Sequence, residues 1–363
     1  MRLFQNSGIY PGYLTRIAQL TARCRSFAER RNVFLADRYS ACHMLQPVLE
    51  GNEIAFFTNG DDKQLQQMWA RENGMASKST LESILLAQIE HHRTEVFYNL
   101  DPMRYGNEFI TKLPGCVKST IAWRAAPSAG ATFCAYDRIV CNFPTILRNH
   151  EANGCKSAYF TPAHDPVMDR YAANVDRPID VMFVGGYSRH HRKRTGMLEA
   201  VARIDERVKV VFYLDRSRLT RLAESPLGLL PPMSKHRRPQ SICKVSTEAV
   251  FGLDLYAALS RAKIVLNCAV DMAGEDRGNM RCWEAMGCGA LMLSDEGMYP
   301  PGMKPGRDFE TYRSASNVVT KITDILADVD TWRSMAAQGR STMANEYSKA
   351  AQWNNFVSIV DSI

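Results

Sequence analysis

The sequence has 363 residues, of which 45% are hydrophobic and 23% are charged, and this length predicts two domains that each bury a core. No apolar run approaches the roughly 18 residues of a membrane-spanning helix, and the first residues, MRLFQNSG, do not resemble a signal peptide. We therefore expect a cytoplasmic globular protein and exclude a membrane-spanning one.

The net charge of +7 is moderate. Basic residues cluster at 23–31, 189–194 and 235–238, but no nucleic-acid-binding signature accompanies them. We expect solvated surfaces there, or attraction to an anionic substrate or to the inner face of a membrane. The ten cysteines form no Cys-x-x-Cys pair, which predicts reduced thiols rather than a disulfide framework or a zinc site.

Short apolar runs alternate with helical patterns in the first half of the chain, which is typical of an α/β protein with parallel sheets. Helices are predicted at 15–30 and 79–91. The polar, proline-marked segment 161–180 is predicted to be an interdomain linker. The predicted strands are 2–5, 33–36, 54–57, 95–99, 119–123, 138–141 and 157–160.

The same alternation restarts after the linker. Residues 215–250 are predicted to be rich in loops, and no internal repeat of 20–50 residues occurs. The predicted strands are 180–186, 208–214, 263–267 and 290–294. The predicted helices are 193–204, 253–261, 279–286, 318–338 and 341–360.

The stretch EDRGNMRCWEAMGCGALMLSDEG, residues 275–297, combines charged residues with a predicted buried strand. The free N–H groups at the start of helix 279–286 suit a phosphate, and Arg277 and Arg281 flank that end. Glu284 lies more than one turn into the helix, where a carboxylate can accept hydrogen bonds from two neighbouring hydroxyl groups of a ribose. Gly287 and Gly289 end the helix. The alternative is an exposed acid beside surface arginines.

The segments DVMFVGGYSRHHRKRTGMLEAV, LYAALSRAKIVLN and NMRCWEAMGCGALMLSDEG occur in this order. Together they resemble the C-terminal domain of group 1 glycosyltransferases, and more narrowly they are similar to the spore-maturation-protein-B-like glycosyltransferases. The resemblance runs from about residue 135 to residue 350. It implies the GT-B fold, in which two Rossmann-like domains face each other across a cleft.

The resemblance also implies roles for individual residues. Glu284 would hold the ribose of a nucleotide-sugar donor. The helix start, Asn279 and Met280, would meet the diphosphate together with Arg281. An acid eight residues before Glu284 touches the donor sugar in many group 1 enzymes, and Asp276, with Glu275 beside it, occupies that place here.

The segment after strand 180–186 corresponds to the place where the family puts a basic residue against the diphosphate. Gly185 and Gly186 form its glycine turn. Arg189, Arg192 and Arg194 are the alternatives for the basic residue, and Arg194 is favoured because it begins a helix. A solvated basic run is the competing interpretation.

The expected domains are an acceptor-binding domain at 1–165, a nucleotide-sugar-binding domain at 166–345 and a C-terminal helix at 346–363 that packs back on the first domain. In the first domain, Gly8 follows a strand and could let the backbone approach the donor. Asp37 or His43 could act as a base on an acceptor hydroxyl. The competing interpretation is a structural His43, since a lone histidine is more often structural than catalytic.

The sequence therefore predicts a glycosyltransferase that moves a sugar from a nucleotide-diphosphate sugar to a hydroxyl of a glycan, lipid-linked or protein acceptor. We expect no cofactor, and no metal because no Asp-x-Asp motif occurs in a suitable loop. The resemblance suggests retention of the anomeric configuration. The alternatives are a nucleotide-sugar epimerase or hydrolase of the same fold, and a non-catalytic protein that binds nucleotide sugars or nucleic acid.

Overall fold

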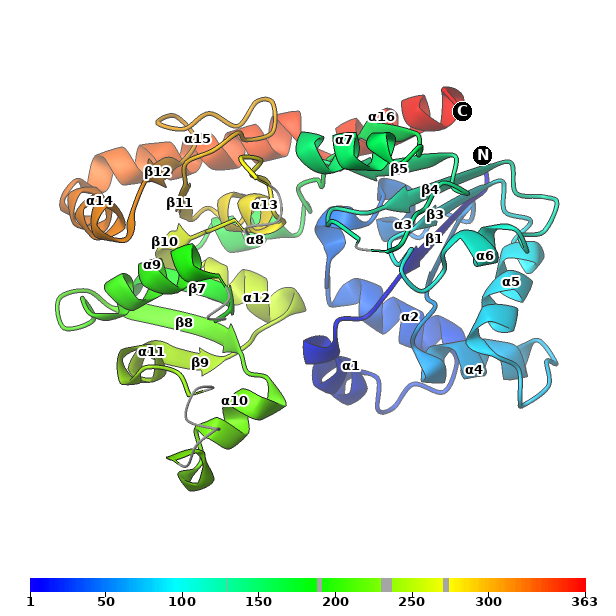
Figure 1. The fold of residues 1–363 in the computed structure, drawn as a ribbon, viewed down its shortest axis with the longest axis horizontal. Helices are drawn as coiled ribbons and strands as arrows, with labels where there is room; N and C mark the ends of the chain where they lie inside the picture. Colours follow the sequence, from blue (N-terminus) through cyan, green and yellow to red (C-terminus); the bar gives the residue numbers. More distant parts are fainter. Residues whose placement is uncertain (129, 188–190, 230–236, 270–273) are drawn as a thin grey trace. The chain divides into compact units, whose positions relative to one another are not determined.

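The computed structural model describes the chain except residues 129, 188–190, 230–236 and 270–273 (Figure 1). The described residues divide into two compact units. Unit 1 contains 1–163, 274–276 and 347–363, and unit 2 contains the remainder of 164–271 and 277–346. No helix among the described residues is both long enough and apolar enough to cross a membrane.

Unit 1 is built on a six-stranded parallel sheet with the strand order β2-β1-β3-β4-β5-β6. All five residues of β1 are buried, as expected for a central parallel strand covered on both faces. The strands are β1 (Leu3–Ser7), β2 (Ala55–Asn59), β3 (Val96–Asn99), β4 (Ser119–Trp123), β5 (Arg138–Cys141) and β6 (Ser157–Tyr159).

The helices of unit 1 include the C-terminal helix α16 (Lys349–Asp361), whose Phe356 packs against Tyr98 and Phe160 with ring centroids 5.0 and 5.8 Å apart. The other helical segments are η1 (Pro11–Tyr13), α1 (Leu14–Leu20), α2 (Phe27–Ala36), η2 (Ala41–His43), α3 (Gln46–Leu49), α4 (Lys63–Glu72), α5 (Leu81–His91), α6 (Asn107–Ile110) and α7 (Pro144–Ala152).

Unit 2 contains a second six-stranded parallel sheet, with the order β12-β11-β10-β7-β8-β9. If these strands are renumbered 1 to 6 starting from β7 and the sheet is read from β9 to β12, the order is 3-2-1-4-5-6. This is the strand order of the Rossmann fold. The strands are β7 (Ile179–Gly186), β8 (Val210–Asp215), β9 (Ser246–Glu248), β10 (Ala262–Leu266), β11 (Leu291–Asp295) and β12 (Glu310–Tyr312).

The main core of unit 2 joins this sheet to two helices that also touch each other, α9 (Arg192–Ala202) and α14 (Ala315–Ala327). Both helices contribute buried apolar side chains to it, among them Leu198 and Ile322. The other helical segments are α8 (Met168–Ala172), α10 (Arg218–Ala223), η3 (Pro226–Leu229), α11 (Gln240–Val245), α12 (Gly252–Leu259), α13 (Arg281–Gly287) and α15 (Val329–Glu346).

Several expectations about local structure are wrong. The predicted helix 15–30 is divided between α1 and α2, and residues 21–26 between them are not helical. Residues 33–36 form the last turn of α2, not a strand, because a capping box between Ser26 and Glu29 starts a helix that continues to Ala36. The predicted helix 318–338 is divided between α14 and α15 at Asp328, whose carboxylate caps the next helix through Thr331. The predicted helix 341–360 is likewise divided, between α15 and α16.

The expectation that all ten cysteines are reduced is also wrong. Cys134 and Cys155 form a disulfide, across a separation of 21 residues. Cys155 follows the end of α7, where the chain turns toward β6, and this turn brings it to the loop that carries Cys134. A pairing made by tertiary structure leaves no local pattern in the sequence.

Candidate functional site

The strands β7 and β10 are neighbours in the sheet of unit 2, although β8 and β9 lie between them in the sequence (Figure 1). The sheet continues through β8 on one side and through β11 on the other, so the strand order reverses between β7 and β10. In open α/β sheets, ligands bind at such a reversal, beside the carboxyl ends of the strands. Most of the predicted binding residues follow these two strands.

Glu284 and Arg281 form an ion pair inside α13, with 2.7 Å between Arg281 Nη1 and Glu284 Oε2. Glu284 is only 3% exposed. Burial raises the pKa of its carboxyl group, and the nearby guanidinium of Arg281 opposes that rise. Apart from this ion pair, Nε and Nη1 of Arg281 are enclosed without a hydrogen-bond partner among the described residues. In such a pair, the carboxylate of Glu284 can accept hydrogen bonds from hydroxyl groups, and the guanidinium of Arg281 can donate hydrogen bonds to phosphate oxygens.

Asn279 and Met280 lie immediately before α13, which begins at Arg281. Asn279 Nδ2 donates to Asn267 Oδ1 at 2.9 Å, and Asn267 Nδ2 donates to Ser294 Oγ at 3.1 Å. Asn279 therefore ties the start of α13 to the ends of two strands. Because α13 has only seven residues, the arginines must supply most of the positive charge at this end.

Gly185 and Gly186 are the last two residues of β7, and Arg194 lies in the first turn of α9. Arg194 Nη2 donates to the carbonyl oxygen of Cys268, just beyond β10, at 2.9 Å. Its Nε is enclosed and has no hydrogen-bond partner in the described part of the chain. Arg194 thus links the segments that follow the two strands. The competing candidate Arg189 lies outside the described residues.

Asp295, at the end of β11, was not among the predicted site residues. Its Oδ1 accepts the N–H of Ala269 at 2.9 Å, and its Oδ2 pairs with Arg277 Nε at 2.8 Å. It therefore holds both sides of the segment that joins β10 to α13, and it engages an arginine that we expected at a diphosphate. An acid directly after an apolar strand was the signal in the sequence.

The predicted first acid lies in the other unit. Asp276 belongs to unit 1 and is 1% exposed. Its Oδ2 accepts the N–H of Thr145, in the first turn of α7, at 2.6 Å, and a carboxylate at this position stabilises a helix start. Glu275 beside it is exposed. The structure therefore does not bring Asp276 and Glu284 together within one unit.

Gly8 follows β1 at the corresponding reversal in unit 1, where β1 neighbours β2 and β3. A Cβ on Gly8 would lie 3.1 Å from Asp101 Oδ2, so the glycine allows Asp101 to approach the loop. Asp61, which we did not predict, accepts the N–H of Ile9 at 2.9 Å. Burial raises the pKa of Asp61, and the charge of Asp101 adds to this rise while the hydrogen bond from Ile9 opposes it.

The two candidate bases of unit 1 are in different situations. The ring of His43 packs against Trp123 with the centroids 4.5 Å apart. Burial, and then the charge of Lys349, lowers the pKa of His43 to about 3, so the imidazole is neutral at neutral pH. Asp37 accepts two hydrogen bonds from Arg16, at 2.6 and 2.9 Å, and one from the Tyr13 hydroxyl at 2.8 Å. Asp37 is therefore engaged in a structural contact.

No group of three or more histidine, cysteine, aspartate or glutamate side chains that could hold a metal ion occurs among the described residues.

A model of the family described as "Glycosyl transferase-like" matches residues 235–358, which include α13, β11 and the terminal helices. No curated protein sequence matches the chain.

Several solved structures share the fold over their full length. HepE from Anabaena, solved with UDP and glucose, has a TM-score of 0.59 at 9% identity, with 100% of both chains covered. A glycosyltransferase from Rickettsia africae has a TM-score of 0.54 at 10% identity, covering 98% of this chain and 97% of that one. Sucrose-phosphate synthase from Thermosynechococcus elongatus has a TM-score of 0.50 at 11% identity, covering 99% and 98%.

These likenesses confirm the predicted fold class, because the two parallel sheets are those of the GT-B fold. The chain has the GT-B fold, and its residues 235–358 are similar to the family described as "Glycosyl transferase-like".

Proposed function

We propose that this protein is a glycosyltransferase that moves a sugar from a nucleotide-diphosphate sugar to a hydroxyl of a glycan, lipid-linked or protein acceptor. The observation that carries the proposal is the buried Arg281–Glu284 pair beside the strand reversal of unit 2. HepE, which has the same fold, was solved in complex with UDP and with UDP-glucose.

In the proposed site, Glu284 accepts hydrogen bonds from the ribose hydroxyls. Arg281 and Arg194 face the diphosphate, since both guanidinium groups retain enclosed N–H groups without a described partner. Asn279 positions the start of α13 through its hydrogen bond to Asn267, and Asp295 positions the preceding segment through its ion pair with Arg277. Gly185 and Gly186 keep the end of β7 free of side chains next to the donor.

The reaction breaks the bond between the anomeric carbon and the diphosphate oxygen, which leaves with the electron pair. The acceptor oxygen forms the new bond to that carbon and loses its proton. Negative charge grows on the diphosphate as the bond breaks, and Arg281 and Arg194 stabilise it in a site that is largely withdrawn from water. In unit 1, the neutral His43 can accept a proton, but its pKa of about 3 makes it a weak base, so it fits the role of acceptor base poorly.

Further properties belong to the same proposal. The reaction retains the anomeric configuration and needs no metal, the protein works in the cytoplasm, and it is closest to the spore-maturation-protein-B-like subgroup. Asp276, or Glu275 beside it, contacts the donor sugar. Asp276 would have to contact the sugar while its Oδ2 accepts the Thr145 N–H.

A thermal-shift screen with nucleotide-diphosphate sugars that differ in base and sugar tests the proposal. One donor should raise the melting temperature, and Glu284→Gln and Arg281→Gln should each weaken its binding at least about ten-fold, or 1.4 kcal/mol. Glu296→Gln, which removes an acid of unit 2 that is 48% exposed, should bind the donor normally. No shift with any donor would exclude the proposed function.

Product analysis separates the enzymatic alternatives. Release of nucleotide diphosphate that depends on an acceptor indicates a transferase. Release into water alone indicates a hydrolase, and an altered sugar that remains on the nucleotide indicates an epimerase. Binding without turnover indicates a non-catalytic protein.

A further inference from the structure

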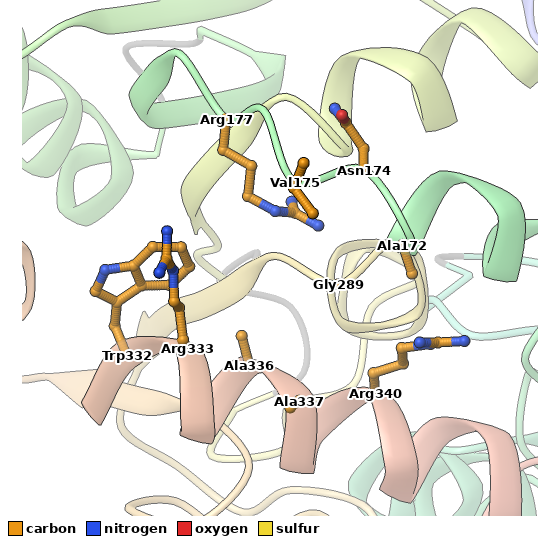
Figure 2. A pocket seen from close by; sticks show the side chains of 10 residues that line it. All are labelled: Ala172, Asn174, Val175, Arg177, Gly289, Trp332, Arg333, Ala336, Ala337 and Arg340. Carbon is orange, nitrogen blue, oxygen red and sulfur yellow. The ribbon is translucent and has the colours of Figure 1, made fainter. Parts of the chain in front are cut away.

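A second pocket lies in unit 2, away from the strand reversal. It has a volume of about 450 Å³, which is in the range of small-molecule sites. Figure 2 shows that one wall is a face of α15 and the other is the segment that follows α8, with Gly289 between them. Gly289 precedes β11, and the segment after α8 leads into β7. The pocket is thus at the amino ends of the strands, opposite the candidate donor site.

The charged side chains that line this pocket are three arginines. Arg333 and Arg340 come from α15, and Arg177 comes from the facing segment. They are accompanied by Ala336 and Ala337, while no carboxylate is among the lining residues. Arg333 and Arg340 are seven residues apart, so they lie on one side of the helix about 10 Å from each other. The arrangement places positive charge around an apolar floor.

Arg177 is a half-buried cation without a carboxylate partner among the described residues. Its Nη1 donates to the carbonyl oxygen of Ala262 at 2.9 Å, and its Nη2 donates to that of Cys288 at 3.0 Å. Burial lowers the pKa of the Arg177 guanidinium. A charge withdrawn from water without a counter-charge is costly, and a bound anion would reduce that cost.

The other two arginines differ in how far they are neutralised. Arg340 pairs with Asp169 at 3.0 Å, and both side chains are more than 40% exposed. Arg333 has its described contact with the ring of Trp332, 5.6 Å from the centroid. The cluster therefore keeps an excess of positive charge even when Asp169 is included.

The apolar part of the pocket is accessible as well. Val175 is 91% exposed at its edge. The floor on α15 is formed by Ala337, which is exposed, and by Ala336, which is only 4% exposed. A neighbouring pocket of about 280 Å³ also contains Trp332, but its charged lining residues are three acids, Glu310, Asp324 and Asp328, and one base, Lys321, so acids are in excess there. An anion would be repelled there, so the preference for negative charge is specific to the arginine-lined pocket.

We propose that the arginine-lined pocket is a second binding site, for a ligand that carries a phosphate group and a small apolar part. The phosphate lies among Arg177, Arg333 and Arg340, because a single guanidinium group can donate two N–H groups to two oxygens of one phosphate. The apolar part lies on Ala336, Ala337 and Val175. The phosphate can belong to a soluble phosphate ester or to a lipid headgroup.

Calorimetric titration with phenyl phosphate tests the soluble source, and vesicles of phosphatidylcholine with and without phosphatidic acid test the lipid source. Titrations are run with and without saturating UDP, which separates this site from the proposed donor site. Phenyl phosphate should bind more tightly than inorganic phosphate, and added salt should weaken the binding. The result without UDP stands even if the proposed function fails.

The double variant Arg333→Gln/Arg340→Gln should lose at least ten-fold in affinity, and Ala337→Glu should have a similar effect by placing a carboxylate in the pocket. All three positions are on the outer face of α15, so the fold should persist, which circular dichroism can verify. The control Arg203→Gln removes a 68% exposed arginine of unit 2 and should bind normally. Binding confined to phosphatidic acid vesicles, and lost in the variants, supports the lipid source. Equal affinity in all variants, or no binding to either probe, would overturn the proposal.

Discussion

Arg281 and Glu284 lie one turn apart on α13, and their side chains are only 16% and 4% exposed at an ion-pair distance of 2.7 Å. Both charges are thus withdrawn from water, and each depends on the other. Removing one partner from such a pair leaves the second without compensation, which usually costs about 3–5 kcal/mol. The proposed donor-binding acid is therefore also part of the stability of unit 2.

Glu284→Gln should change how stability depends on pH. Burial raises the pKa of Glu284 above its ordinary value of 4.5 in the folded protein, so the folded state holds the proton more tightly than the unfolded state. The stability contributed by this group is fully present below pH 4.5, and it is lost as the pH rises through the folded pKa. The free energy of unfolding in urea should therefore fall more steeply with pH in the wild type than in the variant.

The exposed acid Glu296 provides the control for this measurement. Glu296→Gln should give a pH profile parallel to that of the wild type, since its side chain is 48% exposed. Parallel profiles for wild type and Glu284→Gln would mean that the Glu284 carboxyl is solvated in the folded protein.

Asp295→Asn should loosen the segment between β10 and α13. The amide can still accept the N–H of Ala269, but it loses the charge that pairs with Arg277 at 2.8 Å. A charge-assisted hydrogen bond contributes about 1.5–3 kcal/mol, so the Ala269 amide should exchange with deuterium at least ten-fold faster. If the proposed function is correct, donor affinity should decrease as well, and Arg277→Gln should act in the same way.

Asp180 supplies a matched control. It also accepts a main-chain N–H, from Lys209 at 2.8 Å, and it also pairs with a cation, Lys263, at 2.6 Å, but it lies at the amino end of β7. Asp180→Asn should leave the exchange of Ala269 and the donor affinity unchanged. Equal effects of the two variants would show a general loss of stability rather than a local function of Asp295.

Most strands could be predicted from the sequence because they are short apolar runs between polar turns. The edge strands β9 and β12, with the sequences STE and ETY, lack such a run and were not predicted. The bounds of β4 and β5 agree with the predicted 119–123 and 138–141. Residues 33–36 show the limit of this approach, since four apolar residues fit a strand and a helix turn equally well. The decisive information was the Ser26–Glu29 capping box ahead of them.

The contact between Arg281 and Glu284 could be predicted because it is local in the chain. Arg281 and Glu284 are three residues apart on one helix, so their pairing follows from helical spacing. The partner of Asp276 is Thr145, 131 residues away, and no local pattern identifies such a contact. Asp295 was not predicted for the same reason, because its contacts with Ala269 and Arg277 join parts of the chain that are distant in sequence from β11.

Gly287→Ala should destabilise unit 2 because no space exists for a methyl group. A Cβ at this position would lie 2.5 Å from Met168 Sδ and 2.9 Å from His164 Nδ1. Forcing atoms into a packed interior costs about 1–3 kcal/mol, and the melting temperature should fall accordingly. The neighbouring groups belong to the segment that packs on α13, so donor binding should weaken too if α13 shifts.

Gly196 in α9 is the control for this substitution. It is also a helical glycine, but a Cβ there would have no atom within 4 Å. Gly196→Ala should stabilise the protein by about 0.5–1 kcal/mol, since alanine loses less backbone entropy in a helix. If both variants changed stability in the same direction, the contacts around Gly287 would not be the cause.

Lys349→Met should release the C-terminal helix α16 from the rest of unit 1. Lys349 is 5% exposed, and its ammonium group donates to the carbonyl oxygens of Ala41 and Met44 at 2.7 Å and of Cys42 at 3.2 Å. Methionine fills a similar volume but leaves the carbonyl oxygen of Met44 without a donor among the described residues, at about 1–3 kcal/mol if water cannot reach it. Ala41 keeps the N–H of Met44, and Cys42 keeps the N–H of Ala163 and Nε2 of Gln352. The urea midpoint should fall clearly, and proteolysis should cleave near residue 347 first.

A second measurement separates the charge of Lys349 from its packing. Burial is the main reason for the low pKa of His43, about 3, and the Lys349 charge lowers it further, so the pKa should rise in Lys349→Met when it is followed by NMR. The control Lys321→Met removes a lysine that is 37% exposed and paired with Glu310, and it should alter stability by less than about 1 kcal/mol. An unchanged His43 pKa together with a lower midpoint would mean that Lys349 fastens the helix but does not set the protonation of His43.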